Sequence, residues 1–187
     1  MSRSTKVRAL IFVPLIVFAT VSFFFALSYL ITVIFGIPYS LAFPVSARLF
    51  GLLLVGLGLA FLGWLFRTRN PTDVVVSTYV TFVKAVRRIP LGKQSGRTEP
   101  LIIMGPYRYV RHPLYFGVFL LLLGWWVLLD YTFLLFAAIL LLLWFKFVVI
   151  PFEEKELLAI FGDQYENYAK EVASVVPFTK RHKTSKP

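Results

Sequence analysis

Long stretches without a charged side chain constrain the fold of this chain more than any other feature. The two longest can each cross a membrane as a helix, which requires about 20 apolar residues. The other two are shorter and are separated by Asp130 alone, which predicts a tight helical hairpin. The uncharged stretches are residues 9–47, 49–66, 113–129 and 131–145. We therefore expect an all-α integral membrane protein with four transmembrane helices.

Composition supports this class. Of the 187 residues, 58% are hydrophobic and only 16% are charged, which leaves too little polar surface to cover a water-soluble globule. A net charge of +11 would suggest nucleic-acid binding in a soluble domain, but here the cations are expected to set topology and contact anionic headgroups. The chain has no cysteine, which excludes disulfides, thiolate metal sites and a catalytic thiol.

The distribution of cations predicts the orientation, because Lys and Arg are retained on the cytoplasmic side of a membrane. Basic residues precede the first stretch, and many more lie between the second and the third. The opposite side would carry only Arg48 and Asp130. This asymmetry favours four crossings with both termini in the cytoplasm. The cations on the cytoplasmic side would be Arg3, Lys6, Arg8, Arg67, Arg69, Lys84, Arg87, Arg88, Lys93, Arg97, Arg108 and Arg111.

The segment between the second and third stretches predicts a further helix. Asn70 suits an N-cap, Pro71 the first helical position and Asp73 the first turn. A helix over residues 71–89 could lie at the membrane interface, re-enter the membrane or cross it. A polar loop follows at residues 90–100.

The chain has no internal repeat, and residues 1–187 are predicted to form one membrane domain. Its parts are an N-terminal helical pair, a connector, a hairpin with short cytoplasmic C-terminal helices, and a basic tail. They cover residues 1–70, 71–104, 105–178 and 179–187. Gly162 is expected to end the last long helix, and Asp163 with Glu166 has the pattern of a capping box for a further short helix. Small residues in the second stretch predict close helix packing. They are Gly51, Gly56, Gly58, Ala60 and Gly63.

The densest motif is GPYRYVRHPLYFG, at residues 105–117. Pro113 suits the first turn of a helix, and His112 would then occupy the N-cap. A helix start offers free N–H groups and a partial positive charge, which suit a carboxylate or phosphate. Alternatively, Arg111 snorkels, His112 only caps the helix and the tyrosines form an aromatic belt. The spacing alone supports both interpretations equally.

A second motif is PFEEKEL, at residues 151–157, where Glu153 and Glu154 follow a membrane helix. Carboxylates at that depth are costly unless they meet cations. They could face a small-molecule site, pair with Arg108 or Arg111, or be solvated, and pairing or solvation is favoured for this motif alone. Lys146 lies seven residues before Glu153 and so on nearly the same face of a continuous α-helix. The hairpin would bring the two motifs together.

The spacing of these motifs resembles that of the isoprenylcysteine carboxyl methyltransferase family and its relatives, the phospholipid N-methyltransferases and membrane thiol methyltransferases. The resemblance covers about the last 90 residues. It rests on Gly105, Tyr107, Arg111, His112, Pro113, Tyr115, Gly117, Glu153, Glu154, Phe161, Gly162, Tyr165, Tyr168 and Pro177.

The resemblance implies S-adenosylmethionine (SAM) as methyl donor, S-adenosylhomocysteine as product, and no metal. Residues implied to contact the donor are Gln94, Glu99, Pro100, Leu101, Ile102, Tyr107, His112, Pro113, Leu114, Tyr115 and Glu153. Candidates for catalytic contacts are Arg111, Glu154 and Lys146. A carboxylate acceptor is already ionised near pH 7, whereas an amine or thiol must lose a proton, with which Glu154 or a nearby tyrosine could help.

The implied reaction is methyl transfer to a lipophilic acceptor at the cytoplasmic membrane face, with carboxyl O-methylation of a prenylcysteine-like substrate first in order. N-methylation of a phospholipid headgroup and S-methylation of a small thiol are the alternatives. The expected partners are a lipid, or a lipidated small molecule or protein C-terminus, together with membrane lipids and no nucleic acid. Val149 stands where the eukaryotic prenylcysteine enzymes have an arginine thought to orient the substrate carboxylate, and Lys146 could substitute for it.

Two other classes remain open on the sequence. Membrane sterol reductases share an RHP-containing C-terminal region but use NADPH, and their chains are considerably longer. A non-catalytic membrane scaffold also fits the hydropathy, because apolar helices alone do not require catalysis.

Overall fold

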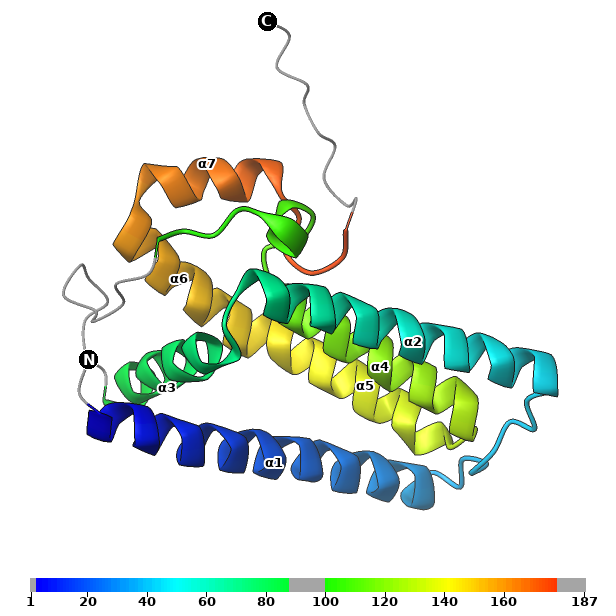
Figure 1. Cartoon of the computed structure of the whole chain (residues 1–187). Coiled ribbons are helices and arrows are strands. Elements are labelled where there is room, and N and C mark those ends of the chain that lie inside the picture. The colour runs from blue at the N-terminus through cyan, green and yellow to red at the C-terminus, as the bar shows by residue number, and fades with distance from the viewer. Residues whose placement is uncertain (1–2, 88–99, 178–187) are drawn as a thin grey trace, which may run out of the picture. The chain divides into compact units, whose positions relative to one another are not determined.

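The computed structural model describes residues 3–87 and 100–177, and the named elements in them are all helical (Figure 1). This confirms the all-α class. One isolated parallel bridge joins Val110 to Ala173. The helices are α1 (Arg3–Ile34), α2 (Val45–Thr68), α3 (Pro71–Arg87), the 3₁₀-helix η1 (Gly105–Arg108), α4 (Pro113–Leu129), α5 (Thr132–Trp144), the π-helix η2 (Phe145–Val149), α6 (Ile150–Phe161) and α7 (Asp163–Glu171).

Three of the described helical stretches are long and apolar enough to cross a membrane. They are Lys6–Ile34, Val45–Thr68 and the continuous stretch Thr132–Phe161, which runs through α5, η2 and α6. The predicted third crossing is α4, an apolar helix of 17 residues. Large apolar side chains such as Phe18 are exposed along α1, and this exposure suits a lipid environment. Together these helices fit an integral membrane protein.

The chain divides into two compact units. Unit 1 contains Met1–Val13, Trp64–Pro113 and Val149–Pro187, and unit 2 contains Pro14–Gly63 and Leu114–Val148. The predicted hairpin is therefore shared: its apolar arms belong to unit 2, whereas the motifs with Arg111, His112, Glu153 and Glu154 all belong to unit 1.

In unit 2, α2 packs closely against α4 through glycines. A Cβ at Gly51 would lie 2.6 Å from the backbone nitrogen of Leu128, and a Cβ at Gly124 would lie 2.7 Å from that of Val55. The prediction of close packing is confirmed at Gly51 and also at Gly58, where an added Cβ would meet Leu121 at 2.9 Å. The predicted set was too broad, because nothing lies within 4 Å of a Cβ added at Gly56 or Gly63.

The predicted tight turn between the hairpin helices is confirmed, and Asp130 anchors it within unit 2. This residue has a positive φ of 59°, and its carboxylate accepts hydrogen bonds from the Ser40 hydroxyl at 2.5 Å and from the backbone N–H groups of Leu41 and Phe43, both at 3.0 Å. The side chain of Arg48 lies 3.9 Å away. The buried charge thereby satisfies the backbone of the α1–α2 connection.

In unit 1, the predicted start of α3 is confirmed, because the Asn70 side chain accepts a hydrogen bond from the N–H of Thr72 at 3.0 Å. Gly162 ends α6 with a φ of 52°, also as predicted. The capping-box prediction was wrong. Asp163 is the first residue of α7 and its side chain caps nothing, while the Gly162 carbonyl accepts the first backbone bonds and Glu166 pairs with Lys170 at 2.6 Å. The backbone carbonyl of Gly162 therefore caps the start of α7, and no side-chain cap is needed.

Candidate functional site

A short parallel pairing holds the segment before α4 in place. The N–H of Arg111 donates to the Ala173 carbonyl at 2.8 Å, and the N–H of His112 donates to the Ser174 carbonyl at 3.0 Å. His112 directly precedes Pro113, the first residue of α4, which is the position predicted for it. The chain after α7 thus fixes the backbone on which the predicted site residues stand.

His112 bridges two neighbouring glutamates of α6, Glu153 and Glu154. Its Nδ1 atom lies 3.2 Å from the Glu153 carboxylate, and its Nε2 atom lies 3.1 Å from the Glu154 carboxylate. The side chain is only 4% exposed. A neutral imidazole has one N–H, whereas an imidazolium donates from both nitrogens, so this arrangement selects the charged form. Although burial opposes the charge, the hydrogen bonds to Glu153 and then to Glu154 outweigh it and raise the pKa of His112.

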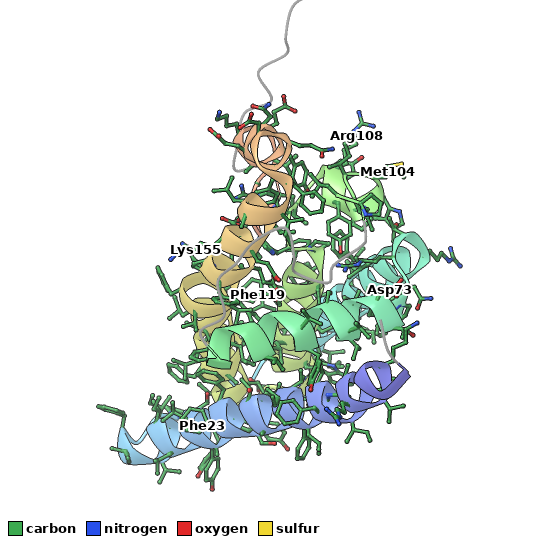
Figure 2. The ribbon with its side chains drawn as sticks, turned by 90° about the vertical axis from the view of Figure 1, so that its left-hand side faces the viewer. Phe23, Asp73, Met104, Arg108, Phe119 and Lys155 are labelled. Atoms are coloured by element: carbon green, nitrogen blue, oxygen red, sulfur yellow. The ribbon has the colours of Figure 1, made fainter. Side chains whose placement is uncertain are left out.

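Arg111 completes a cluster of four charged side chains. Its Nη2 atom lies 2.8 Å from the same Glu154 oxygen that faces His112, and its Nη1 atom donates to the Ala169 carbonyl at 3.1 Å. The Arg111 side chain is 10% exposed. The prediction that a glutamate of the second motif pairs with Arg111 is therefore confirmed for Glu154. By contrast, Arg108 is exposed and points away from the ribbon (Figure 2).

The remaining predicted residues of unit 1 lie before this cluster in the chain. The carbonyl oxygen of Tyr107, in η1, accepts a hydrogen bond from the Tyr168 hydroxyl at 2.6 Å, which fastens η1 to α7. Pro100 is exposed, and Leu101 and Ile102 are half-buried in irregular backbone. Figure 1 shows this segment, in green, running beside α7. The predictions for Gln94 and Glu99 lie outside the described residues.

Three predicted site residues belong to unit 2. Leu114 is half-buried, and the buried ring of Tyr115 stacks on Phe145 with the centroids 4.4 Å apart. Lys146 is exposed, and its ammonium lies 5.5 Å from the centre of the Phe147 ring. The seven-residue spacing from Lys146 to Glu153 assumed a continuous α-helix. The π-helical stretch η2 breaks that register, since its turns contain more residues.

Two residues next to the cluster were missed as site candidates. Tyr165, in α7, is 3% exposed, and its hydroxyl has no hydrogen-bond partner among the described residues. Glu156, in α6, is 1% exposed and makes a polar contact. The sequence analysis named Tyr165 only among the residues that carry the family resemblance, and no local pattern predicts the isolation of its hydroxyl. No pattern distinguishes Glu156 from the two glutamates before it.

The cluster does not resemble a metal site. In the described residues 3–87 and 100–177, no three His, Asp or Glu side chains gather in a way that could hold a metal ion. Both nitrogens of His112 already face carboxylates, and Glu154 already faces a guanidinium. Carboxylates, a guanidinium and an imidazolium instead suit an organic ligand that carries both signs of charge.

A sequence model of phospholipid methyltransferases matches residues 48–164, which is more than half of the chain and includes all four charged residues of the cluster. The chain belongs to the phospholipid methyltransferase family. The resemblance inferred from the motifs is thereby confirmed, and the matched stretch of this family extends upstream to α2, well before the motifs themselves.

Curated relatives in this family act on different acceptors, according to their names. A methanethiol S-methyltransferase of Crocosphaera subtropica is 35% identical over 63% of this chain and 44% of its own. A protein-S-isoprenylcysteine O-methyltransferase of Schizosaccharomyces pombe is 44% identical over 46% of this chain and 37% of its own. A methanethiol S-methyltransferase of Mycobacterium tuberculosis is 37% identical over 41% of this chain and 30% of its own. The matches span less than half the length of these relatives, and no solved structure matches the chain.

Proposed function

We propose that this protein transfers a methyl group from SAM to a lipophilic acceptor at the cytoplasmic face of a membrane. The observation that carries the proposal is the cluster of the buried His112 with the half-buried Arg111, Glu153 and Glu154, assembled in a chain of the phospholipid methyltransferase family. Charged side chains are retained at the end of a membrane helix only where they find partners or a ligand. This cluster contains two positively charged and two negatively charged side chains.

The donor set fits SAM. The ligand has an amino-acid portion with an ammonium and a carboxylate, ribose hydroxyls and an adenine. Glu153 is the carboxylate for the ammonium or the ribose. His112 and Pro113 remain predictions from the resemblance, because the His112 N–H already donates to the Ser174 carbonyl and proline has no N–H. Tyr107 and the segment Pro100–Ile102 would line the adenine end. Tyr115, Leu114, Gln94 and Glu99 remain predictions from the resemblance.

SAM supplies a methyl group on a sulfonium, which is transferred without a covalent enzyme intermediate. The protein has only to hold donor and acceptor in line and to exclude water. Glu154 faces the guanidinium of Arg111 and the imidazolium of His112, so its carboxylate is already engaged by two cations. An acceptor that is already an anion therefore suits this site better than one that must first lose a proton.

The first acceptor to test is the carboxylate of a prenylcysteine-like molecule, which is ionised at neutral pH. A small thiol is the second candidate, because the half-buried Val149 provides no cation for a substrate carboxylate. The names of the Crocosphaera and Mycobacterium relatives support the same candidate. A thiol has a pKa of about 8.5 and so supplies a small thiolate fraction near pH 7 without a strong base.

The proposed topology has four crossings with both termini in the cytoplasm. Besides the three long apolar stretches, this topology requires α4 to cross the membrane. Its 17 residues rise about 25 Å, close to the thickness of about 30 Å of a hydrocarbon core. Because the chain contains no cysteine, single cysteines introduced in turn at residues 5, 40 and 170 can be tested with a membrane-impermeant thiol reagent. Labelling of residue 40 from the side opposite to residues 5 and 170 is expected. Labelling of all three from one side would contradict the topology.

Ligand-induced stabilisation tests the donor. S-adenosylhomocysteine should raise the unfolding temperature of the detergent-purified protein and NADPH should not, because a ligand that binds the native state stabilises it. The reverse result would assign the chain to the reductases, and a response to neither would favour a scaffold. Transfer of labelled methyl to farnesylcysteine, phosphatidylethanolamine and a small thiol then identifies the acceptor.

A further inference from the structure

The Tyr165 hydroxyl is buried without a partner in the described part of the chain. The residue is 3% exposed, and its ring lies 6.0 Å from that of Tyr168. Burying a hydroxyl that makes no hydrogen bond costs free energy, so native structures keep very few of them. Such a group beside a cluster of charges indicates a partner that comes from outside the chain.

The surroundings of this hydroxyl make it a donor. Burial, and next the negative charge of Glu154, raise the pKa of Tyr165 above its usual value, so its proton stays in place at neutral pH. The positive charge of the nearby Arg111 guanidinium acts in the opposite direction and lowers the pKa of Tyr165, but it does not outweigh burial and Glu154. The Nε–H of Arg111 is also buried without a hydrogen-bond partner in the described residues. An arginine nitrogen can only donate.

The charges of the cluster limit what these donors can bind. Arg111 and the His112 imidazolium balance Glu153 and Glu154, so a ligand with a large net charge would be poorly matched. A zwitterion brings one charge of each sign and keeps the balance. The carboxylate of an α-amino acid is the strongest acceptor that such a ligand offers to two donors.

We propose that the Tyr165 hydroxyl, together with the Arg111 Nε–H, binds the carboxylate of the amino-acid portion of the methyl donor. The assignment rests on the proposed function and adds to it a binding residue in α7. Glu153 then takes the ammonium of the same portion. The amino-acid end of the donor is thus held by Glu153 of α6, Tyr165 of α7 and Arg111.

Tyr168 provides a matched control in the same helix. Its hydroxyl donates to the Tyr107 carbonyl at 2.6 Å and is therefore satisfied within the protein. Removing it should destabilise the fold, because a half-buried carbonyl loses its partner. Removing the Tyr165 hydroxyl should leave the ligand-free fold as stable as before or more stable, because an unsatisfied group disappears. The two Tyr→Phe variants are thus expected to have opposite effects.

The test compares two ligands on three proteins. S-adenosylhomocysteine contains the amino-acid portion, and 5′-methylthioadenosine lacks it. Affinities of both are measured by titration calorimetry on wild type, Tyr165→Phe and Tyr168→Phe, together with unfolding temperatures without ligand. We expect Tyr165→Phe to weaken S-adenosylhomocysteine about tenfold or more and to leave 5′-methylthioadenosine unchanged. In Tyr168→Phe the ratio of the two affinities should stay at the wild-type value.

Each other result is decisive. A folded Tyr165→Phe variant with the wild-type affinity ratio overturns the role of this hydroxyl. A Tyr165→Phe variant that is much less stable without ligand also overturns it, because the hydroxyl would then have a partner within the protein. Failure of the wild type to bind S-adenosylhomocysteine is a separate result, read before any variant is made, and it rejects the proposed function itself together with this role.

Discussion

The guanidinium of Arg111 and the carboxylate of Glu154 lie 2.8 Å apart. The next residue, His112, contacts the same carboxylate, although it is 42 positions away from Glu154 in the sequence. Two neighbouring cations thus share one oxygen of Glu154, while the Glu153 carboxylate faces the other nitrogen of the imidazole. Glu153 and Glu154 of α6 therefore have different environments. Their substitutions should accordingly have different effects on folding and on ligand binding.

Substitution of Arg111 should lower the free energy of unfolding, because Glu154 loses one of its two cations. Arg111→Met leaves the Glu154 charge half-buried beside a single cation, and we expect a loss of about 2 kcal/mol in unfolding free energy. The double variant Arg111→Met with Glu154→Leu should recover part of the loss, because neither charge is then left alone. Chemical unfolding in detergent measures both. Additive losses in the double variant would show that the pair is not coupled.

The protonation of His112 should make stability depend on pH. Its pKa is raised in the folded state, so the stabilisation is fully present below the unfolded value of about 6.5 and is lost as pH rises through the higher folded value. The unfolding temperature should therefore fall between about pH 6.5 and that value. His112→Asn should remove this slope, whereas His182→Asn, which replaces the other histidine, should keep it. A wild-type profile that rises over the same interval would contradict the imidazolium.

Glu153→Gln tests the proposed ligand contact. The amide keeps the shape of the side chain but loses the charge that would hold an ammonium, so the affinity for S-adenosylhomocysteine should fall about tenfold or more. The variant should still fold, as judged by its unfolding transition. Glu166→Gln, an exposed glutamate in α7, is the control and should bind like the wild type. Equal affinities in all three proteins would remove Glu153 from the site.

Val149→Arg tests the choice of acceptor. Val149 ends η2. The family resemblance implies an arginine at this position in the prenylcysteine enzymes, so an introduced guanidinium should improve methylation of farnesylcysteine relative to a small thiol. Val148→Arg, one residue earlier and exposed, is the matched control. The ratio of the two methylation rates is the measurement. A ratio unchanged in Val149→Arg, or raised equally by Val148→Arg, would count against this position as a determinant of the acceptor.

Two glycines of unit 2 should respond oppositely to alanine. A Cβ at Gly124 would meet backbone atoms of α2 at 2.7 and 3.0 Å, so Gly124→Ala should lower the unfolding free energy by about 1 to 3 kcal/mol. Nothing lies within 4 Å of a Cβ at Gly56, and Gly56→Ala should raise it by up to about 1 kcal/mol through helix propensity. If both variants lose stability equally, α2 and α4 do not approach each other through Gly124.

Several elements followed directly from local patterns. The uncharged stretches identified the helices from α1 to α5, apart from α3. Asn70 and Gly162 marked the start of α3 and the end of α6, because a side-chain cap and a positive φ are local requirements. The pairing of Arg111 with Glu154 was also foreseen as an alternative, since a charge near lipid must find a counter-charge.

Other features depend on tertiary interactions that no local pattern encodes. The parallel pairing of Arg111 and His112 with Ala173 and Ser174 joins segments about 60 residues apart, and neither reads as a strand. The π-helical stretch η2 has ordinary apolar composition, so the spacing argument for Lys146 could not anticipate the change of register. The isolation of the Tyr165 hydroxyl is visible only once its neighbours are in place. The roles of the individual site residues stay predictions.

The pairing of His112 with Ser174 also has a consequence for how the protein is made. The backbone N–H groups of Arg111 and His112 have carbonyl partners only after Ala173 and Ser174 have been synthesised, long after the apolar helices α4 and α5. A chain interrupted before Ala173 would keep its apolar helices but would leave the charged cluster without its backbone support. Completion of the site is therefore a late event in biosynthesis, because it requires translation to pass residue 174, whereas the apolar helices all precede that residue in the chain.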